Sequence, residues 1–135
     1  MMERTLAIIK PDAMAAGHAD AIVAMIKDHG FSIIKSMRTK LTLNEAQGFY
    51  LEHRARPFYN EMTNDMTSGE VIVMVLERDN AVKGWRDLMG ATNPAEAAEG
   101  TVRKLYGSSV GKNATHGSDL PVSAACEIIY FFPHL

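Results

Sequence analysis

The sequence contains a single cysteine, Cys126, among its 135 residues. One cysteine cannot form a disulfide within the chain, which excludes a secreted scaffold held together by internal bridges. Long hydrophobic runs are also missing, because the longest, at 21–26 and 71–76, cover six residues each. A membrane-spanning helix needs about 20 apolar residues, and the N-terminus lacks the apolar core of a signal peptide. We therefore expect a cytoplasmic protein with no membrane association.

Neither sign of charge is in large excess. The chain has 14 Lys and Arg residues against 16 Asp and Glu residues, a formal net charge of −2. Proteins that live mainly on nucleic-acid phosphates usually carry a basic excess, so no obligatory nucleic-acid partner is expected. Hydrophobic residues make up 47% and charged residues 22%, which excludes a disordered chain. The length fits one domain, and we expect residues 1–135 to form it.

The standard phosphate-binding and metal-binding motifs are missing as well. The chain has no Gly-x-x-x-x-Gly-Lys-Ser/Thr loop, no Gly-x-Gly-x-x-Gly fingerprint and no protein-kinase signature. It has no Cys-x-x-Cys or His-x-x-x-His pair, which makes a structural zinc site improbable. A protein of this sequence that handles phosphate must therefore use side-chain cations.

Hydrophobic patterning and turn residues predict an alternation of strands and helices. Strands are expected at 4–9, 31–40 and 71–76, and helices at 19–29, 43–53, 58–66, 80–89 and from Pro121 onward. Thr42 and Glu45 have the spacing of a capping box, Gly30 ends a helix, and Asp119 is the expected cap of the last helix. The segment 90–117 is interpreted as a long irregular loop, and long ordered loops in compact domains are usually functional.

Strands separated by helices indicate an α/β or α+β sandwich. The helices suffice to cover one face of the sheet but hardly two, so a partner subunit is expected to cover the other. We therefore expect an oligomer.

Among the charged side chains, Lys10 stands out because it lies where a strand ends in a Pro-Asp turn, a common place for ligand sites. Arg86, Arg103 and Lys112 are the other candidate cations. His116 lies in a short polar stretch with Gly117 immediately after it, where the backbone can approach a ligand closely. The remaining histidines are interpreted as ordinary surface residues: His18, His29, His53 and His134.

The stretch Asn113-Ala-Thr-His116-Gly-Ser-Asp119 resembles the signature Asn-x-x-His-Gly-Ser-Asp of nucleoside diphosphate kinases. Five further segments resemble that family in the same order. They are residues 4–12 (RTLAIIKPD), 56–58 (RPF), 66–69 (MTSG), 86–94 (RDLMGATNP) and 100–103 (GTVR). The resemblance extends over roughly residues 3 to 132. Because many members continue beyond the position of Leu135, it points to a bacterial-type member with a short C-terminus.

The resemblance implies an α+β fold, a ferredoxin-like βαββαβ sandwich whose four-stranded antiparallel sheet has its helices on one face. The fourth strand would be the segment about His116. The implied activity is transfer of the γ-phosphate of ATP to a nucleoside diphosphate, a ping-pong reaction through a phosphohistidine at His116 that maintains NTP and dNTP pools. An imidazole suits this role, because its ordinary pKa of about 6.5 leaves it largely neutral at pH 7.

By the same resemblance, Glu127 accepts from the other ring nitrogen of His116, and Ser118 supports the pair by hydrogen bonding. For Glu127 the alternative is an exposed face of the last helix. Tyr50 matches a tyrosine near the transferred phosphate, although an ordinary helix residue there would look the same. Lys10, Arg86 and Arg103 match the phosphate-contacting cations, which suits a reaction governed by positioning and charge.

Three matches concern the rest of the nucleotide. Thr92 matches a hydroxyl donor to phosphate, and Asn113 matches an amide that bonds the ribose. Phe58 matches the residue on which the base stacks, whereas a lone Phe would otherwise be interpreted as core. Stacking on one ring tolerates every base, which would explain a broad choice of nucleotide. Mg²⁺ is expected to bridge phosphate oxygens, with few or no protein ligands.

The implied partners are ATP and other NTPs, NDPs and dNDPs, together with further copies of the chain in a dimer-based tetramer or hexamer. Two other classes of function stay open. One is a catalytically silent nucleotide-binding regulator on the same fold. The other is a phosphohydrolase, which would release inorganic phosphate at a rate comparable to transfer.

Overall fold

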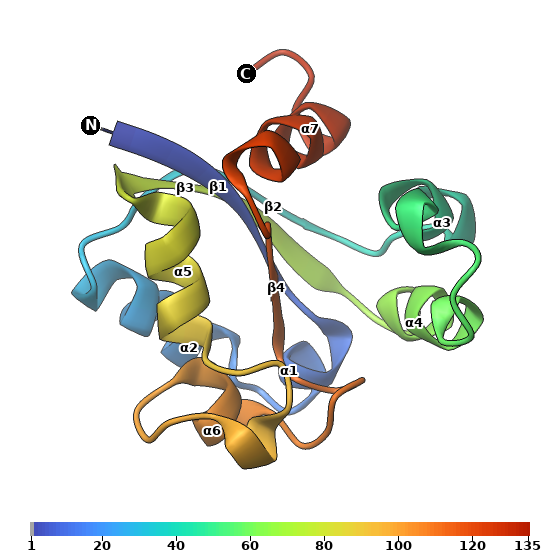
Figure 1. The fold of residues 1–135 in the computed structure, drawn as a ribbon, viewed down its shortest axis with the longest axis horizontal. Coiled ribbons are helices and arrows are strands. Elements are labelled where there is room, and N and C mark those ends of the chain that lie inside the picture. Colours follow the sequence, from blue (N-terminus) through green and yellow to red (C-terminus); the bar gives the residue numbers. More distant parts are fainter. Residues whose placement is uncertain (1) are drawn as a thin grey trace.

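A computed structural model describes residues 2–135, and its centre is a four-stranded antiparallel sheet in the order β2-β3-β1-β4 (Figure 1). The strands are β1 (Met2–Ile9), β2 (Ser32–Thr39), β3 (Val71–Asp79) and β4 (Thr115–Gly117). This order is the ferredoxin-like arrangement expected from the sequence. β1 pairs with β3 along its whole length, from Met2 opposite Asp79 to Ile9 opposite Ile72. β4 adds three residues on the other side of β1, with His116 opposite Ile8.

The helices connect the strands. They are α1 (Pro11–Ala15), α2 (Ala19–Asp28), α3 (Leu43–Phe49), α4 (Tyr59–Met66), α5 (Ala81–Met89), α6 (Val102–Tyr106) and α7 (Pro121–Phe131), with short 3₁₀ turns η1 (Leu51–His53) and η2 (Pro94–Glu96). Of these helices, α2, α4, α5 and α7 sit close to their expected positions, whereas α1 and α6 were not expected. Among residues 2–135, none of these helices combines the length and the apolar character that a membrane crossing requires.

One face of the sheet packs against α2 and α5. Ile22 and Ile26 of α2 and Trp85 of α5 are fully buried against strand residues such as Met74 and Leu76. The alternation of a β-strand sends these side chains to one face and their neighbours to the other. The continuously apolar segment 71–76 is therefore a strand buried on both faces, as its pattern predicted.

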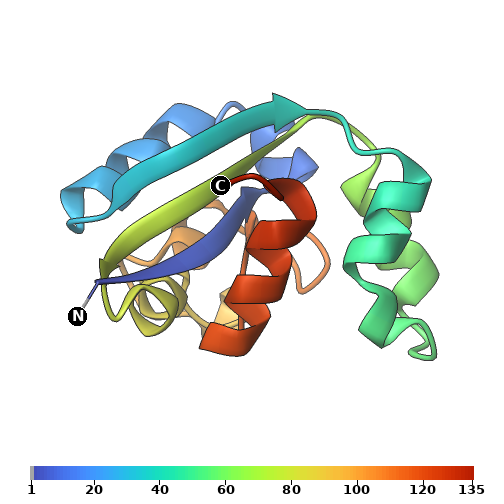
Figure 2. The ribbon, with the colours of Figure 1, turned by 90° about the horizontal axis from the view of Figure 1, so that it is seen from above.

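The opposite face is not left bare. Leu6, Ile8 and Val73 are fully buried in a second apolar cluster, which includes Ala46 of α3 and has Ile128 of α7 packed against it. Figure 2 shows α7 on one side of the sheet and α2 and α5 on the other. The expectation that helices cover only one face is therefore wrong, because α7 returns across β1. An uncovered face consequently gives no support for an oligomer.

The chain between β2 and β3 forms α3 and α4, a pair of helices beside the sheet (Figure 1). The capping box is present, because Glu45 N donates to Thr42 Oγ1 at 3.1 Å and Thr42 N donates to Glu45 Oε1 at 2.9 Å. The helix expected over 43–53 ends at Phe49 and is followed by η1. Gly48 just before this end weakens the last turn, because glycine loses more backbone freedom in a helix than other residues do.

The segment 90–117 is more regular than its sequence suggested, because it contains η2, α6 and β4. Each is three to five residues long, too short to show a period in the sequence. The expected cap of the last helix is also different. Leu120 is the N-cap of α7 and makes no side-chain cap bond, whereas Asp119 faces α5.

Candidate active site

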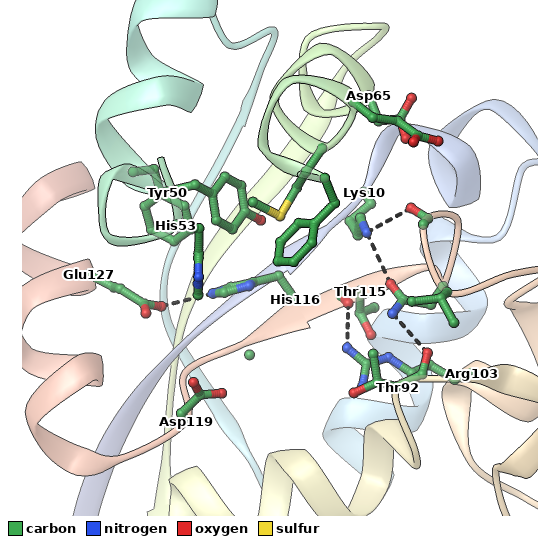
Figure 3. Close-up of a pocket in the computed structure, with 18 of the residues that line it drawn as sticks. Lys10, Tyr50, His53, Asp65, Thr92, Arg103, Thr115, His116, Asp119 and Glu127 are labelled. Atoms are coloured by element: carbon green, nitrogen blue, oxygen red, sulfur yellow. Dashed lines mark hydrogen bonds and ion pairs between the residues drawn. The ribbon is translucent and has the colours of Figure 1, made fainter. Parts of the chain in front are cut away.

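A cavity of about 530 Å³ lies where these connecting segments meet. Its lining comes from the end of β1, from α3 to α4, from α5, from the segment 90–117 and from α7, with His116 of β4 among the lining residues (Figure 3). In Figure 3, Glu127 and Tyr50 lie to one side of His116, and Lys10 and Arg103 lie to the other. A cavity of this size suits a small organic ligand.

The backbone around His116 is fixed by α5. Trp85 Nε1 donates a hydrogen bond to the carbonyl oxygen of His116 at 3.1 Å. A Cβ atom on Gly117 would lie 2.5 Å from Met89 Cε and 2.6 Å from Trp85 Cδ1, so only glycine fits there. This close approach of β4 to α5 sets the depth of His116 in the cavity.

The turn before β4 is held by the end of β1. Ala114 has a φ of 74°, a left-handed conformation that is strained for a residue with a Cβ. Its N–H donates to Asp12 Oδ2 at 3.1 Å, and its carbonyl oxygen accepts from Lys10 N at 2.8 Å. The Lys-Pro-Asp turn therefore holds the strained residue two positions before His116.

His116, Ser118 and Glu127 form one hydrogen-bonded group. His116 Nε2 lies 2.9 Å from Glu127 Oε1, and Ser118 Oγ donates to the same oxygen at 2.9 Å. The side chains of His116 and Glu127 are 19% and 17% exposed, and Ser118 is fully buried. Nδ1 of His116 has no hydrogen-bond partner among residues 2–135. A neutral ring that donates from Nε2 keeps its lone pair on Nδ1.

Two neighbouring aromatic rings, from α3 and its C-terminal cap, pack against the imidazole. Phe49 lies edge-on with its ring centre 5.1 Å from that of His116, and Tyr50 does so at 5.8 Å. Burial and the neighbouring Glu127 charge raise the pKa of Tyr50, so its phenol stays protonated at neutral pH. Phe49 was not singled out from the sequence, because a Phe in an amphipathic helix carries no signal of its own.

Two cations occupy the opposite wall, and both are bound by neutral groups. Lys10 Nζ donates to Gly111 O at 3.1 Å and to Asn113 Oδ1 at 3.0 Å. Burial lowers the pKa of Lys10, although Asp12 partly offsets this. Arg103 donates to two carbonyl oxygens, those of Gly90 and Thr115, at 3.1 and 2.9 Å.

Arg103 is the more constrained of the two. Burial, followed by the nearby charge of Arg86, lowers the pKa of Arg103 to about 10, so the guanidinium stays charged at neutral pH. Its Nε and the hydroxyl of Thr115 have no hydrogen-bond partner among the described residues. Buried polar groups without a partner are rare and call for an explanation.

Of the remaining candidates, Arg86 and Phe58 lie nearer the surface, whereas Asn113 is buried. Arg86 Nη1 donates to Asp119 Oδ1 at 2.9 Å. Asn113 Nδ2 donates to Thr92 O at 3.0 Å, which ties the two segments that carry these residues together. Phe58 is 45% exposed and lines the cavity, so it does not belong to the core.

The structure thus brings the sequence-derived candidates to one place. Those that line the cavity are Lys10, Tyr50, Phe58, Arg86, Thr92, Arg103, Asn113, His116 and Glu127. Ser118 lies beneath, bound to Glu127. Lys112, the remaining candidate cation, is not among the lining residues.

Several lining residues were missed, among them Glu52, His53, Glu61, Asp65, Val110 and Asp119. His53 was interpreted as an ordinary surface histidine, but it lines the cavity, with its ring 6.5 Å from that of Tyr50 and 6.1 Å from that of Phe58. Its spacing of three residues from Tyr50 was an available signal, since such residues share a helix face. The acidic residues of the lining had no such signal in the sequence.

Comparisons with known proteins agree with this geometry. The family model described as nucleoside diphosphate kinase matches residues 3–135. The nucleoside diphosphate kinase of Syntrophotalea carbinolica is 56% identical over 134 residues, 99% of this chain and 98% of that protein. That of Desulfotalea psychrophila is 53% identical over 134 residues, again 99% and 98% of the two chains.

Solved structures give the same result. The crystal structure of the Aquifex aeolicus nucleoside diphosphate kinase superposes with a TM-score of 0.96 at 41% identity, covering 98% of this chain and 96% of that one. The enzyme from Encephalitozoon cuniculi superposes with a TM-score of 0.93 at 37% identity, covering 96% and 88%. With a family model, close relatives and near-identical folds all spanning almost its full length, this chain belongs to the nucleoside diphosphate kinase family.

Proposed function

We propose that the phosphate transferred by this chain is carried on His116. As a nucleoside diphosphate kinase, the chain is a phosphotransferase that moves phosphate between nucleotides. In the proposed relay, the γ-phosphate of ATP passes to His116, ADP leaves, and a second nucleoside diphosphate takes the phosphate from His116. The observation that carries the proposal is the 2.9 Å contact between Nε2 and Glu127, which leaves Nδ1 for the attack.

Each half of the reaction balances around this imidazole. Nδ1 donates its lone pair to the γ-phosphorus, the bond from that phosphorus to the β–γ bridging oxygen breaks, and the departing ADP takes that electron pair. Nε2 keeps its proton toward Glu127, whose carboxylate stabilises the positive ring while the phosphate is attached. The second half runs the same steps backward with a new diphosphate.

Positioning and charge supply the rest of the catalysis. Lys10, Arg86 and Arg103 face the cavity and would contact phosphate oxygens. The exposed side chain of Thr92 offers a further donor for them. Tyr50, kept protonated by burial, lies beside His116 and would stay neutral as the phosphate arrives.

Phe58 and Asn113 would hold the nucleoside. The Phe58 ring is exposed at the cavity, where a base can stack on it regardless of its hydrogen-bonding edge. Asn113 already bonds Lys10 and Thr92, so it would add the ribose hydroxyls to an existing network. Base stacking on Phe58 together with ribose binding by Asn113 would let the site accept nucleotides with many different bases.

Mg²⁺ would come with the nucleotide. Among the residues that the structure describes, no three His, Cys, Asp or Glu side chains are grouped to hold a metal ion. The ion would be held by phosphate oxygens. There it would neutralise phosphate charge. The protein's own contribution is to hold the phosphates with Lys10, Arg86 and Arg103.

We infer a homo-oligomer built from dimers, a tetramer or a hexamer, in the cytoplasm. Support comes from β2, an eight-residue edge strand with one side unpaired among the described residues. Such edges are usually covered. Native mass spectrometry would give the number of subunits, and a monomer at micromolar concentration would contradict the inference.

The test of the relay is a trapped phosphoenzyme. Protein is incubated with γ-labelled ATP and Mg²⁺, and acid-labile, base-stable label on the chain is measured before and after addition of GDP. We expect label that appears without an acceptor and leaves as GTP. His116→Ala should remove it, whereas His134→Ala, an exposed histidine outside the cavity lining, should not.

Three results would overturn the relay. Absence of label with ATP still bound would favour the silent regulator, and release of inorganic phosphate at the rate of transfer would favour the phosphohydrolase. Full transfer activity in His116→Ala would exclude this histidine as the carrier.

A further inference from the structure

The three cations of the cavity differ in what they bind. Lys10 and Arg103 donate only to neutral carbonyl and amide oxygens among the described residues. Arg86 instead forms an ion pair with a carboxylate, since its Nη1 lies 2.9 Å from Asp119 Oδ1. One of the three phosphate-binding cations is therefore already paired with an anion in the free protein.

Asp119 is also distinct among the carboxylates of the cavity. The lining contains Glu52, Glu61, Asp65, Asp119 and Glu127. Within residues 2–135, Asp119 alone of these is in a salt bridge with a cavity Lys or Arg, because Glu127 faces His116 and Glu52 faces His53. Asp119 is therefore placed to decide how much of the Arg86 charge a phosphate meets.

We propose that Asp119 is a positioning residue that competes with the nucleotide phosphates for Arg86. This inference rests on the proposed function, in which Arg86 contacts phosphate. When a nucleotide enters, the Arg86 guanidinium exchanges the carboxylate for phosphate oxygens, and when the nucleotide leaves, the carboxylate takes it back. The exchange breaks one ion pair and forms another, with no covalent change.

Exposure makes this exchange easy in both directions. The Arg86 and Asp119 side chains are 43% and 71% exposed. Ion pairs in such positions contribute little to folding, because water screens them and the long side chains lose entropy. Asp119 also repels the incoming phosphates directly, because like charges destabilise each other at short range.

Weaker binding has a use in a two-step relay. The enzyme must release a nucleotide after each half-reaction, and release or opening steps limit many fast enzymes. Binding that is equally strong before and during the reaction does not raise kcat. A carboxylate that competes for Arg86 lowers the affinity for the bound diphosphate without contacting His116. The diphosphate therefore dissociates faster.

The test is the affinity for ADP, measured without Mg²⁺ by calorimetry at low salt, for wild type and Asp119→Asn. We expect the variant to bind ADP roughly 3- to 10-fold more tightly, with slower release in stopped flow. In turnover, KM should fall and kcat should fall with it. Raising the salt concentration should shrink the difference, because screening weakens exposed charges. An unchanged or weaker affinity would overturn the proposal.

Two further variants separate this competition from other effects. Asp87 lies on α5, the helix that carries Arg86, but outside the cavity lining, and its carboxylate is paired with Lys83 at 2.7 Å. The variant Asp87→Asn should therefore bind ADP with the same affinity as wild type. In an Arg86→Gln background, Asp119→Asn should tighten binding less than it does alone, as a double-mutant cycle measures. An equal gain in both backgrounds would refute competition through Arg86.

Failure of this inference differs from failure of the proposed function. If Arg86→Gln weakens ADP binding while Asp119→Asn does not tighten it, only the competition is wrong. If Arg86→Gln leaves ADP binding unchanged, or His116 takes up no label, the proposed function itself is at fault.

Discussion

Glu127 and His116 lie eleven positions apart, on α7 and β4, yet their Oε1 and Nε2 atoms are 2.9 Å apart. The contact forms because the chain turns sharply at Asp119 and Leu120 and returns as a helix across β1. Ser118, within that turn, donates to the same carboxylate oxygen. Glu127 thus fixes both the orientation of the ring and the nitrogen left for chemistry.

Replacing Glu127 by Gln should slow formation of the phosphoenzyme by about 10- to 100-fold, the usual cost of losing a partner that orients a functional imidazole. The amide keeps the size of the side chain but loses the charge that stabilises the phosphorylated ring. The rate is measured by rapid quench with labelled ATP, and KM should change little. Ser118→Ala, which removes one donor to Glu127, should have a smaller effect. A variant as fast as wild type would show that Glu127 does not orient His116.

Replacing Phe58 by Ala should weaken binding of every nucleoside diphosphate. Base-to-aromatic stacking is worth about 1–3 kcal/mol per base, so Kd should rise by roughly 5- to 150-fold. The Kd values for ADP, GDP and CDP measured by calorimetry should rise by similar factors, because stacking needs only a flat ring. A loss confined to one base would contradict stacking as the source of a broad choice. Phe58→Trp is the matched control and should retain binding.

Replacing Gly117 by Ala should lower the free energy of unfolding by about 1–3 kcal/mol, the usual cost of an overpacked core. The new methyl would lie 2.6 Å from Trp85 Cδ1, a buried ring that cannot move aside freely. Urea unfolding followed by circular dichroism measures the loss. Gly69→Ala is the control, because its methyl would meet only Pro11 Cβ at an ordinary 3.6 Å. Equal stability of the two variants would mean that β4 has room to shift.

Replacing Thr5 by Val should stabilise the protein by about 1 kcal/mol. Thr5 is fully buried in β1, and its hydroxyl has no hydrogen-bond partner among the described residues. A buried group left without a partner costs its desolvation energy, which valine avoids. Thr63→Val is the control, because that buried hydroxyl donates to Tyr59 O and Asn60 O. It should show no gain in thermal unfolding, and a loss of stability in Thr5→Val would reveal a partner that the structure lacks.

Much of the fold was predictable because its signals are local. The capping box at Thr42, the glycine stop at Gly30 and the apolar run at 71–76 each predicted an element that the structure contains. β4 was not predictable from pattern, since three residues show no alternation, and it came only from the family resemblance. α7 covers the second face of the sheet because of the direction that the chain takes after the turn before it. That direction depends on tertiary packing and cannot be predicted from one segment of the sequence.

The candidate site likewise contains residues that the sequence indicated and residues that it did not. Residues in a distinctive motif, such as His116 and Lys10, could be singled out from the sequence. Asp119 also lies in the motif, but its local signal favoured a helix cap, and its partner Arg86 lies 33 positions away. The cavity carboxylates Glu61 and Asp65 look like any exposed helix residues. Their placement depends on the packing of α4 beside the sheet.

Lys10 should make the activity of the protein depend on pH. Burial lowers the pKa of this lysine below its ordinary value of 10.5, with Asp12 opposing the shift and Arg103 adding to it. Because kcat/KM reports the free enzyme, it should fall as pH rises through this lowered pKa, at a lower pH than an ordinary lysine would give. Bound phosphates favour the charged amine, so kcat should hold to a higher pH, and KM should therefore rise first.

The control for this assignment is Lys10→Met, which keeps the length of the side chain without its charge. Its kcat/KM should be low at all pH values and should lack the alkaline limb. Stability is a poorer readout, because two groups act in opposite senses in neighbouring pH ranges. The lowered pKa of Lys10 makes the protein more stable as pH rises toward 10.5, whereas the raised pKa of Tyr50 makes it less stable as pH rises above 10. An alkaline limb that persists in Lys10→Met would assign it to another group, with Arg103 next in line because burial lowers its pKa to about 10.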